Sequence, residues 1–183
     1  MGKADRTRAA LVREALELFD ERGYDATTTA AIAARAGVSE MTFFRHFASK
    51  DAVLVDDPYD PLIADAVRRQ PDGLPPLAAV IAGVADAWAG VPPPASAEVR
   101  DRLRIVSRTP SLRGVLTRNS AGTSDAIVTA LVSRGVARAD ARIAAEAAIG
   151  ALNAALLEWA DRDEGTLGSA IDSALSVLSG GLR

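Results

Sequence analysis

The sequence predicts an all-α protein with an N-terminal three-helix unit and a larger helical body, about nine helices in all. Three observations indicate this class. Alanine is abundant and aromatic residues make up only 4% of the 183 residues, a composition that favours helices over sheets. Apolar residues recur at helical spacing along most of the chain. Glycines, prolines and capping hydroxyls separate these segments where helices would begin and end.

The first three helices are expected within residues 1–50. A long helix over residues 3–22 places Leu11, Ala15 and Leu18 on one face, and Gly23 ends it. Thr27-Thr28 supplies an N-cap hydroxyl for a short helix that ends near residue 36, and Ser39 caps a third helix over residues 40–47. We therefore expect one domain over residues 1–50.

A second domain is expected over residues 51–183. Its first helix starts at Lys50, capped by Ser49, and is broken by Pro58 and Pro61, because proline disfavours helix in the residue before it. Further helices are expected at residues 62–70, 77–89, 97–107, 110–134 with a break near Gly122, 139–162 and 166–178.

The helix at 139–162 is apolar on nearly all sides. Ile149, Leu152, Leu156 and Trp159 form one stripe; Ala147, Gly150, Ala151, Ala154 and Leu157 form another. In the last helix, Leu167, Ile171, Leu175 and Leu178 line one face; Ala170, Ala174 and Val177 line another. A helix of this kind must be buried on most sides. We therefore predict a homodimer built from residues 139–162 and 166–178.

Composition excludes several functions. The chain has no cysteine, so disulfides and thiol nucleophiles are excluded. The N-terminus lacks a secretory signal, and no uncharged stretch is long enough to span a bilayer, so we expect a cytoplasmic protein without a membrane partner. The net charge is −3, but residues 1–50 hold eight Lys and Arg against seven Asp and Glu. This asymmetry alone does not predict nucleic-acid binding.

The helix pair within residues 28–47 has the layout of a DNA-binding helix-turn-helix. The turn needs a residue that tolerates unusual backbone dihedral angles, and Gly37 supplies it. Ile32, Val38, Phe43 and Phe47 can pin the second helix from inside, with Phe43 and Phe47 assigned to the core. Thr42, Arg45 and His46 can face the major groove, and Thr28 and Lys50 lie where phosphate contacts are expected. Thr28 could act as a helix cap instead of a phosphate contact, or as both. For His46, the only histidine, the alternative to a DNA contact is a structural role.

The same segment resembles the signature of the TetR family. The resemblance is carried by Gly23-Tyr24-Asp25-Ala26-Thr27-Thr28-Thr29, Ile32-Ala33, Ala36-Gly37-Val38-Ser39, Thr42-Phe43-Phe44-Arg45-His46-Phe47 and Ser49-Lys50. It implies a homodimeric repressor that binds an inverted DNA repeat and releases it when a small-molecule effector fills the C-terminal domain. The DNA-contacting residues that it implies are Thr28, Thr29, Ser39, Glu40, Met41, Thr42, Phe44, Arg45, His46 and Lys50.

One position departs from the family pattern. Phe44 stands where the family usually has a tyrosine whose hydroxyl contacts phosphate, and phenylalanine cannot make that bond. Base reading by Arg45 has an alternative too, since many members read bases from the positions of Glu40 and Met41.

A second resemblance concerns the body. Residues 40–47 together with Tyr59-Asp60-Pro61-Leu62-Ile63 are similar to the mycofactocin-regulator branch, which implies an acyl-coenzyme A ligand. Arg100, Arg104 and Arg108 recur at i, i+4 and i+8, as a solvated face or as an anion clamp. Trp88, Trp159 and Asn153 are the remaining ligand-site candidates. The tryptophans could line a pocket or only pack in the core, and Asn153 could contact the ligand or form a hydrogen bond across the dimer.

Rival functions remain open at this point. Asp56, Asp57 and Asp60 lack the spacing of a calcium loop and are interpreted as turn formers, and neither metal nor cofactor is expected. An enzyme is not expected, because the only histidine lies in the helix-turn-helix and no phosphate-binding glycine loop is present. There are two alternatives to a ligand-responsive regulator. One is a constitutive DNA-binding protein, and the other is a helical small-molecule carrier with a vestigial DNA-binding domain.

Overall fold

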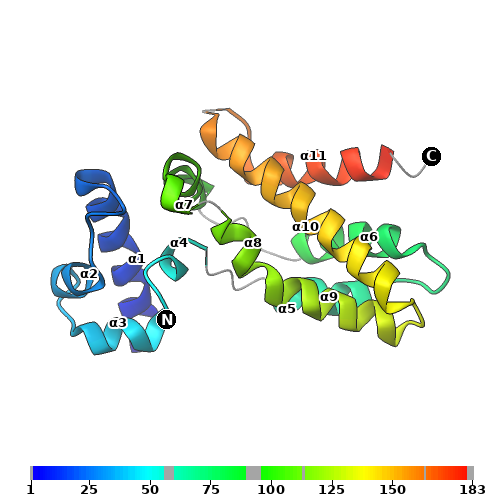
Figure 1. Cartoon of the computed structure of the whole chain (residues 1–183), viewed down its shortest axis with the longest axis horizontal. Helices are drawn as coiled ribbons and strands as arrows, with labels where there is room; N and C mark the ends of the chain where they lie inside the picture. The colour runs from blue at the N-terminus through cyan, green and yellow to red at the C-terminus, as the bar shows by residue number, and fades with distance from the viewer. Residues whose placement is uncertain (1, 56–59, 90–95, 113, 163, 181–183) are drawn as a thin grey trace.

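The computed structural model describes residues 2–55, 60–89, 96–112, 114–162 and 164–180. Within these ranges the chain is helical and contains no strand, as the sequence predicted. In Figure 1 the N-terminal helices lie at one end of the longest axis and the larger body lies at the other. The helical elements are α1 (Lys3–Arg22), α2 (Thr29–Arg35), α3 (Glu40–His46), α4 (Ala52–Val55), α5 (Asp60–Arg68), α6 (Pro76–Ala89), α7 (Ser96–Arg108), the 3-10 turn η1 (Pro110–Leu112), α8 (Val115–Asn119), α9 (Ala121–Ser133), α10 (Arg138–Asp161) and α11 (Leu167–Gly180).

One predicted break falls elsewhere, and another lies within two residues of its expected position. The helix expected after Pro61 already begins at Asp60, so Pro61 is the second residue of α5. Proline is tolerated there because the first N–H groups of a helix have no partner within it. Gly122 lies inside α9, and the break expected there falls at Ser120, while Gly114 adopts a left-handed φ of 77° before α8. Asp56, Asp57 and Pro58 lie outside the described residues.

Two hydrophobic clusters hold the chain together. One joins α1, α2, α3 and α4 with the end of α7, with η1 and with α8, through buried residues that include Leu11, Phe43, Leu54 and Val106. The other joins α5, α6, α7, α9, α10 and α11. Leu116 on α8 packs against both. The N-terminal unit is therefore attached to the body by packing around α4 and α8 as well as by the chain.

The helices α10 and α11 have one buried side and one exposed side. On α10, Ile149 and Trp159 are buried in the body cluster, whereas Ala147, Gly150 and Ala154 are exposed. The first predicted stripe therefore faces the core, and the second is exposed at Ala147, Gly150 and Ala154 but partly buried at Ala151 and Leu157. On α11, Ala170 and Ala174 of the second predicted stripe are buried within the single chain, whereas Val177 is exposed.

One helix among the described residues, α10, is long and apolar enough by composition to cross a membrane. A third of its most apolar window is buried inside this structure, at 33%. A core helix of a soluble protein passes the same test, so a single helix of this kind is weak evidence for a membrane span.

Candidate nucleic-acid interface

The second and third helices are anchored from inside as the sequence predicted. Ile32 and Phe43 are fully buried, Phe47 is buried and Val38 is partly buried, all within the N-terminal cluster. The Phe43 and Phe47 rings lie 5.6 Å apart, and the guanidinium of Arg8 on α1 lies 4.7 Å from the centre of the Phe47 ring. These contacts fix the inner face of α3 and leave its other face exposed.

The turn between α2 and α3 requires glycine. Gly37 has φ of 71°, and its N–H donates to the carbonyl of Ala34 at 3.1 Å. The next N–H, that of Val38, donates to Ala33 at 2.9 Å. A Cβ added at Gly37 would meet no atom within 4 Å, so the preference for glycine comes from the backbone conformation and not from lack of space.

Both helices begin with a hydroxyl cap. The Thr28 hydroxyl accepts a hydrogen bond from the N–H of Ala31 at 3.1 Å, and the Ser39 hydroxyl accepts one from Thr42 at 3.2 Å. A side-chain cap of this kind contributes about 1 kcal/mol. The capping role suggested for Thr28 is therefore present in the structure, and it is compatible with a phosphate contact by the same residue.

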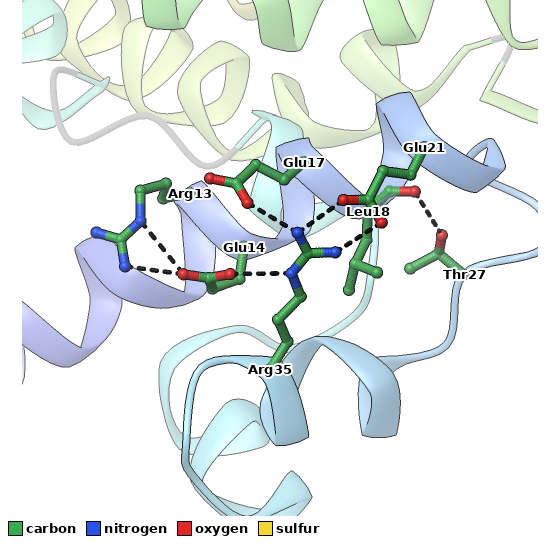
Figure 2. Close-up of polar contacts among 7 residues, drawn as sticks. All are labelled: Arg13, Glu14, Glu17, Leu18, Glu21, Thr27 and Arg35. Atoms are coloured by element: carbon green, nitrogen blue, oxygen red, sulfur yellow. Dashed lines mark hydrogen bonds and ion pairs between the residues drawn. The ribbon is translucent and has the colours of Figure 1, made fainter.

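A charged network fastens α2 to α1. Arg35, the last residue of α2, reaches three carboxylates that lie along one face of α1 (Figure 2). Its guanidinium nitrogens lie 3.2 Å from Glu14, 3.0 Å from Glu17 and 2.7 Å from Glu21. The bond from Arg35 is the main cause that lowers the pKa of Glu21. Sequence periodicity did not single out this network, because its members are up to 21 residues apart.

The outer face of α3 carries an unusual mixture of side chains. Met41 is 77% exposed and Phe44 is 52% exposed, although both are large and apolar. Glu40 and Arg45 are also exposed, whereas Thr42 and His46 are partly buried. The hydroxyl of Thr42 lies 3.0 Å from that of Ser39 and accepts from Arg45 at 3.1 Å. Large apolar side chains at the surface of a short helix are typical of an interaction site.

A groove lies beside this face. It has a volume of about 640 Å³ and runs between the start of α1 and α3. Lys3 and Thr7 join Arg45 and His46 in its lining, so cations from two elements face one hollow. Lys3 and Thr7 could not be predicted as part of this site, because a residue at the start of a helix carries no local signal of its tertiary neighbours. The full lining is Lys3, Ala4, Thr7, Val38, Thr42, Arg45 and His46.

The side chains of Lys50 and Thr27 donate hydrogen bonds to backbone carbonyls within the N-terminal part of the chain. Lys50, a predicted phosphate contact, donates to the carbonyl oxygens of Tyr24 and Thr27 in the turn between α1 and α2. Burial lowers the pKa of Lys50. The Thr27 hydroxyl, predicted only as a helix cap, is buried and donates toward the carbonyls of Gly23 at 2.9 Å and Leu18 at 3.3 Å. A lysine ammonium has three donors, so the phosphate role of Lys50 stays a prediction.

Arg100, Arg104 and Arg108, three of the four arginines of α7, contact the end of α10 or the loop after it. The guanidinium of Arg104 donates to the carbonyl of Ala160 at 2.7 Å, and that of Arg100 donates to Gly165 at 2.8 Å. Arg108 lies 3.8 Å from the carboxylate of Asp161. The last carbonyls of a helix lack partners within it and carry partial negative charge, so cations stabilise this end. Arg100 and Arg104 are partly buried and Arg108 is exposed, and both roles considered for them, a solvated face and an anion clamp, stay predictions.

The tryptophans and Asn153 lie in or beside the body cluster. Trp159 is buried, lies 4.5 Å from the Arg100 guanidinium and donates from its indole N–H to Gly165 at 3.2 Å. Trp88 on α6 packs against the same cluster, and a Cβ added at Gly168 on α11 would lie 3.5 Å from its indole nitrogen. Asn153 is partly buried on α10. Both tryptophans therefore pack in or against the body cluster, and their role as pocket residues stays a prediction. Among the described residues, no group of three or more acidic or histidine side chains is arranged to hold a metal ion.

Comparisons with known proteins agree with this architecture. Residues 11–56 match the family model of the bacterial regulatory proteins of the tetR family, and residues 74–183 match the MftR C-terminal domain. The second match covers most of the body, whereas the segment at residues 59–63 that suggested this branch lies before it.

Individual relatives were also found. The chain is 39% identical over 126 residues to the HTH-type transcriptional regulator TcmR of Streptomyces glaucescens, which covers 64% of this chain and 55% of that protein. The match thus spans about half the length of that relative. Among solved structures, FadR of Thermus thermophilus, a transcriptional repressor in complex with lauroyl-CoA, is 25% identical with a TM-score of 0.52 and coverage of 96% of this chain and 95% of that one.

A second solved structure has the same fold. FadR of Bacillus halodurans, a fatty acid degradation regulator, is 19% identical, with a TM-score of 0.58 and coverage of 96% and 99%. The capped and anchored helix pair, the all-helical body and the match of its C-terminal domain lead to one conclusion: the chain belongs to the TetR family of bacterial regulatory proteins, with a C-terminal domain of the MftR type.

Proposed function

We propose that this protein is a ligand-responsive transcriptional repressor that binds an inverted-repeat operator as a homodimer in the cytoplasm. TetR-family regulators are DNA-binding repressors that respond to small molecules and act as dimers, and the family is one of transcription factors rather than enzymes. The observation that supports the DNA-binding role most is α3, which is anchored through Phe43 and Phe47 while Met41 and Phe44 stay exposed.

The outer face of α3 enters the major groove in this proposal. Its first residues then meet base edges, since the recognition helix of a helix-turn-helix reads bases from its N-terminal part. The hydroxyl and cationic side chains around it meet the phosphates and set the register on the duplex. The proposed contacts are Thr28, Thr29, Ser39, Glu40, Met41, Thr42, Phe44, Arg45, His46 and Lys50.

The dimer forms through α10 and α11. Support comes from the exposed face of α10, where Ile143 is 68% exposed and continues the line of Ala147, Gly150 and Ala154. On α11, Val177 is 73% exposed. Small and apolar residues at these positions allow two such helix pairs to pack closely. The two copies of α3 then lie near one turn of DNA apart, about 34–36 Å, or wider for a longer operator.

The effector is a largely apolar molecule, and a fatty acyl-coenzyme A is the candidate. Support comes from the MftR-type domain and from the Thermus thermophilus FadR structure with lauroyl-CoA. Trp88 and Asn153 are candidate contacts within the body, with Trp159 and the α7 arginines beside them.

Release of DNA is proposed to pass through α4. This helix packs in the N-terminal cluster and contacts α1, α7 and α8. A shift of the body would therefore move the DNA-binding helices. A ligand moves such an equilibrium only by its differential affinity for the two states, and a 100-fold preference corresponds to about 2.7 kcal/mol. Operator DNA must weaken ligand binding by the same factor.

Selection of genomic DNA fragments by the purified protein tests the DNA-binding role. We expect fragments that share an inverted repeat, and recovery of unrelated sequences would contradict the proposal. The chosen operator is then titrated with acyl-coenzyme A of several chain lengths, with free coenzyme A as the control. An unchanged operator affinity at every chain length would reject this effector class and leave the regulator role standing.

The same experiments separate the two alternatives. A constitutive DNA-binding protein would select an operator but respond to no small molecule. A small-molecule carrier with a vestigial DNA-binding domain would bind the ligand but would select no DNA sequence.

A further inference from the structure

Two helix starts meet on the proposed DNA-facing side. Thr29 is the first residue of α2, and Glu40 is the first residue of α3. The hydroxyl of Thr29 donates to the Oε1 atom of Glu40 at 2.6 Å, across the turn that joins the two helices. Because Thr29 is partly buried and sits on a capped helix, it restricts the rotamers of an otherwise exposed glutamate.

A carboxylate at this place is unfavourable for binding DNA in general. Every phosphate carries a negative charge, and like charges repel when water is removed from between them. Two cations lie together in the groove beside α3, Arg45 near the end of that helix and Lys3 at the start of α1. An acidic group held here is compensated only where the DNA offers a hydrogen-bond donor.

The major groove offers such a donor on cytosine. On its major-groove edge cytosine presents the N4 amino group with no acceptor of the same base beside it, and glutamate or aspartate accepts from that group. Adenine also has an amino group, but its N7 acceptor lies next to it and faces an approaching carboxylate. Each carboxylate oxygen has about two acceptor sites, so the bond from Thr29 to Oε1 leaves Oε2 with the capacity to accept from a base.

Resting on the DNA-binding role proposed above, we propose that Glu40 selects a cytosine in each half of the operator and that Thr29 is the positioning residue for its carboxylate. Glu40 reads the base directly through Oε2. Thr29 acts through Glu40 by holding Oε1. The preference is repeated symmetrically in the two half-sites, because each subunit contributes one α3.

The rival role of Glu40 is to stabilise α3. An acidic residue in the first turn of a helix interacts favourably with the partial positive charge there. That role predicts an equal loss on every DNA sequence when Glu40 is changed. A base-reading role predicts a loss confined to one base-pair position, so the two are separated by sequence preference and not by affinity.

The experiment selects duplexes from a randomised library with the full-length protein and with Glu40→Ala. We expect the wild type to require cytosine at one position of each half-site, with roughly a ten- to hundred-fold weaker Kd for other bases there. Glu40→Ala loses this preference and keeps the remaining ones. The control is Asp20→Asn, which removes one negative charge from the exposed side of α1 and should leave all base preferences unchanged.

The atomic contact is tested by a base analogue. The selected cytosine is replaced by 2-pyrimidinone, which lacks the exocyclic amino group. This replacement should weaken binding of the wild type and have much less effect on Glu40→Ala. Thr29→Val should reduce the discrimination between cytosine and the other bases while the melting temperature stays close to that of the wild type, and Thr29→Ser should restore it.

Three results would overturn the inference. One is a wild-type operator without cytosine at any position that Glu40→Ala affects. Another is a uniform loss of affinity for all sequences in Glu40→Ala, which assigns Glu40 to helix stability. The third is an equal cost of the analogue in both proteins. Failure of the wild type to select any sequence would instead reject the DNA-binding role itself.

Discussion

The ammonium nitrogen of Lys50 lies 4.0 Å from the centre of the Tyr24 ring and donates to the carbonyl oxygen of Tyr24 at 2.7 Å. A second bond, at 2.8 Å, reaches the carbonyl of Thr27. Burial, assisted by Asp51 and Asp25, raises the pKa of Tyr24 to about 12, so the phenol stays neutral at physiological pH. Lys50 thus ties the chain after α3 to the turn between α1 and α2.

This arrangement predicts that Lys50→Met destabilises the free protein. The variant loses the cation–ring contact and two charge-assisted bonds, for an expected loss of roughly 1–2 kcal/mol at a partly exposed site. Thermal and urea unfolding without DNA measure it. The control is Arg22→Met, an exposed cation at the end of α1. An unchanged stability, with a salt slope of DNA binding that is lower by about one unit, would assign Lys50 to the phosphates alone.

The ion pair between Glu21 and Arg35 predicts a pH-dependent contribution to stability. The pKa of Glu21 is lowered from 4.5, first by the hydrogen bond from Arg35. A lowered pKa in the folded state contributes stability that is present above the unfolded value and is lost as the pH falls through the folded value. Glu21→Gln should therefore lower the melting temperature at pH 7, and its difference from the wild type should shrink below pH 4.5. A difference that stays constant down to pH 3 would contradict this; Asp20→Asn is the control.

Local signals predicted the N-terminal unit well, and the reason is visible in particular residues. Gly23, Gly37 and the caps Thr28 and Ser39 act within a few residues of their own position, so their effect can be inferred from sequence. The boundaries of α1 to α3 agree with the prediction to within one residue or two. The division at residues 50 and 51 stays a prediction, although α4 packs with the N-terminal cluster.

Partners distant in the sequence could not be predicted. The carbonyls that Arg100 and Arg104 meet lie 65 and 56 residues away, and periodicity shows only that the two arginines share a face. Lys50 was assigned to phosphate by position, because the internal carbonyls that it meets belong to a turn 23 to 26 residues earlier. Whether a charged side chain meets solvent, ligand or backbone is decided by tertiary packing.

The bond from Arg104 predicts that Arg104→Ala loosens the end of α10. Removing the donor leaves the carbonyl of Ala160, a fully buried residue, without its partner, and we expect a loss of roughly 1–3 kcal/mol. Hydrogen exchange of the last turn of α10 should increase in the absence of any ligand. Arg108→Ala is the control, since that side chain is more exposed and its carboxylate partner lies 3.8 Å away.

The Arg104→Ala variant also tests whether the effector is an acyl-coenzyme A. If Arg104 clamps phosphates as well, Arg104→Ala should weaken an acyl-coenzyme A much more than the matching free fatty acid. Unchanged stability and unchanged hydrogen exchange would show that the bond to Ala160 contributes nothing.

The crossing of α5 and α6 predicts that Gly83→Ala is destabilising. A Cβ at Gly83 would lie 2.5 Å from Cγ2 of Val67 and 2.7 Å from its backbone nitrogen. Because backbone atoms cannot rotate aside, the two helices must separate, which typically costs about 1–3 kcal/mol. Gly122→Ala is the matched control in α9, where an added Cβ meets no atom within 4 Å. Urea unfolding should show a loss for the first variant only; equal stability of the two would mean that the crossing adjusts freely.

The exposed face of α10 predicts how the proposed dimer can be separated. Ala154 is exposed in the single chain, whereas Ala174, which belongs to the second apolar stripe of α11, is buried against its own subunit. Ala154→Glu should therefore give folded monomers, because it places a charge in the interface without disturbing the core. Ala174→Glu should unfold the protein instead.

Analytical ultracentrifugation at micromolar concentration, combined with circular dichroism, distinguishes these outcomes. The control is Ser173→Glu, at an exposed position on α11 next to the buried Ala174. It tests whether the exposed side of α11 shares the interface, and it should remain folded in either case. Because each half of an operator is contacted by one subunit, monomeric Ala154→Glu should also lose most of its operator affinity while keeping weak, salt-dependent binding to any DNA. A wild-type protein that sediments as a monomer would contradict the interface and the inverted-repeat operator together.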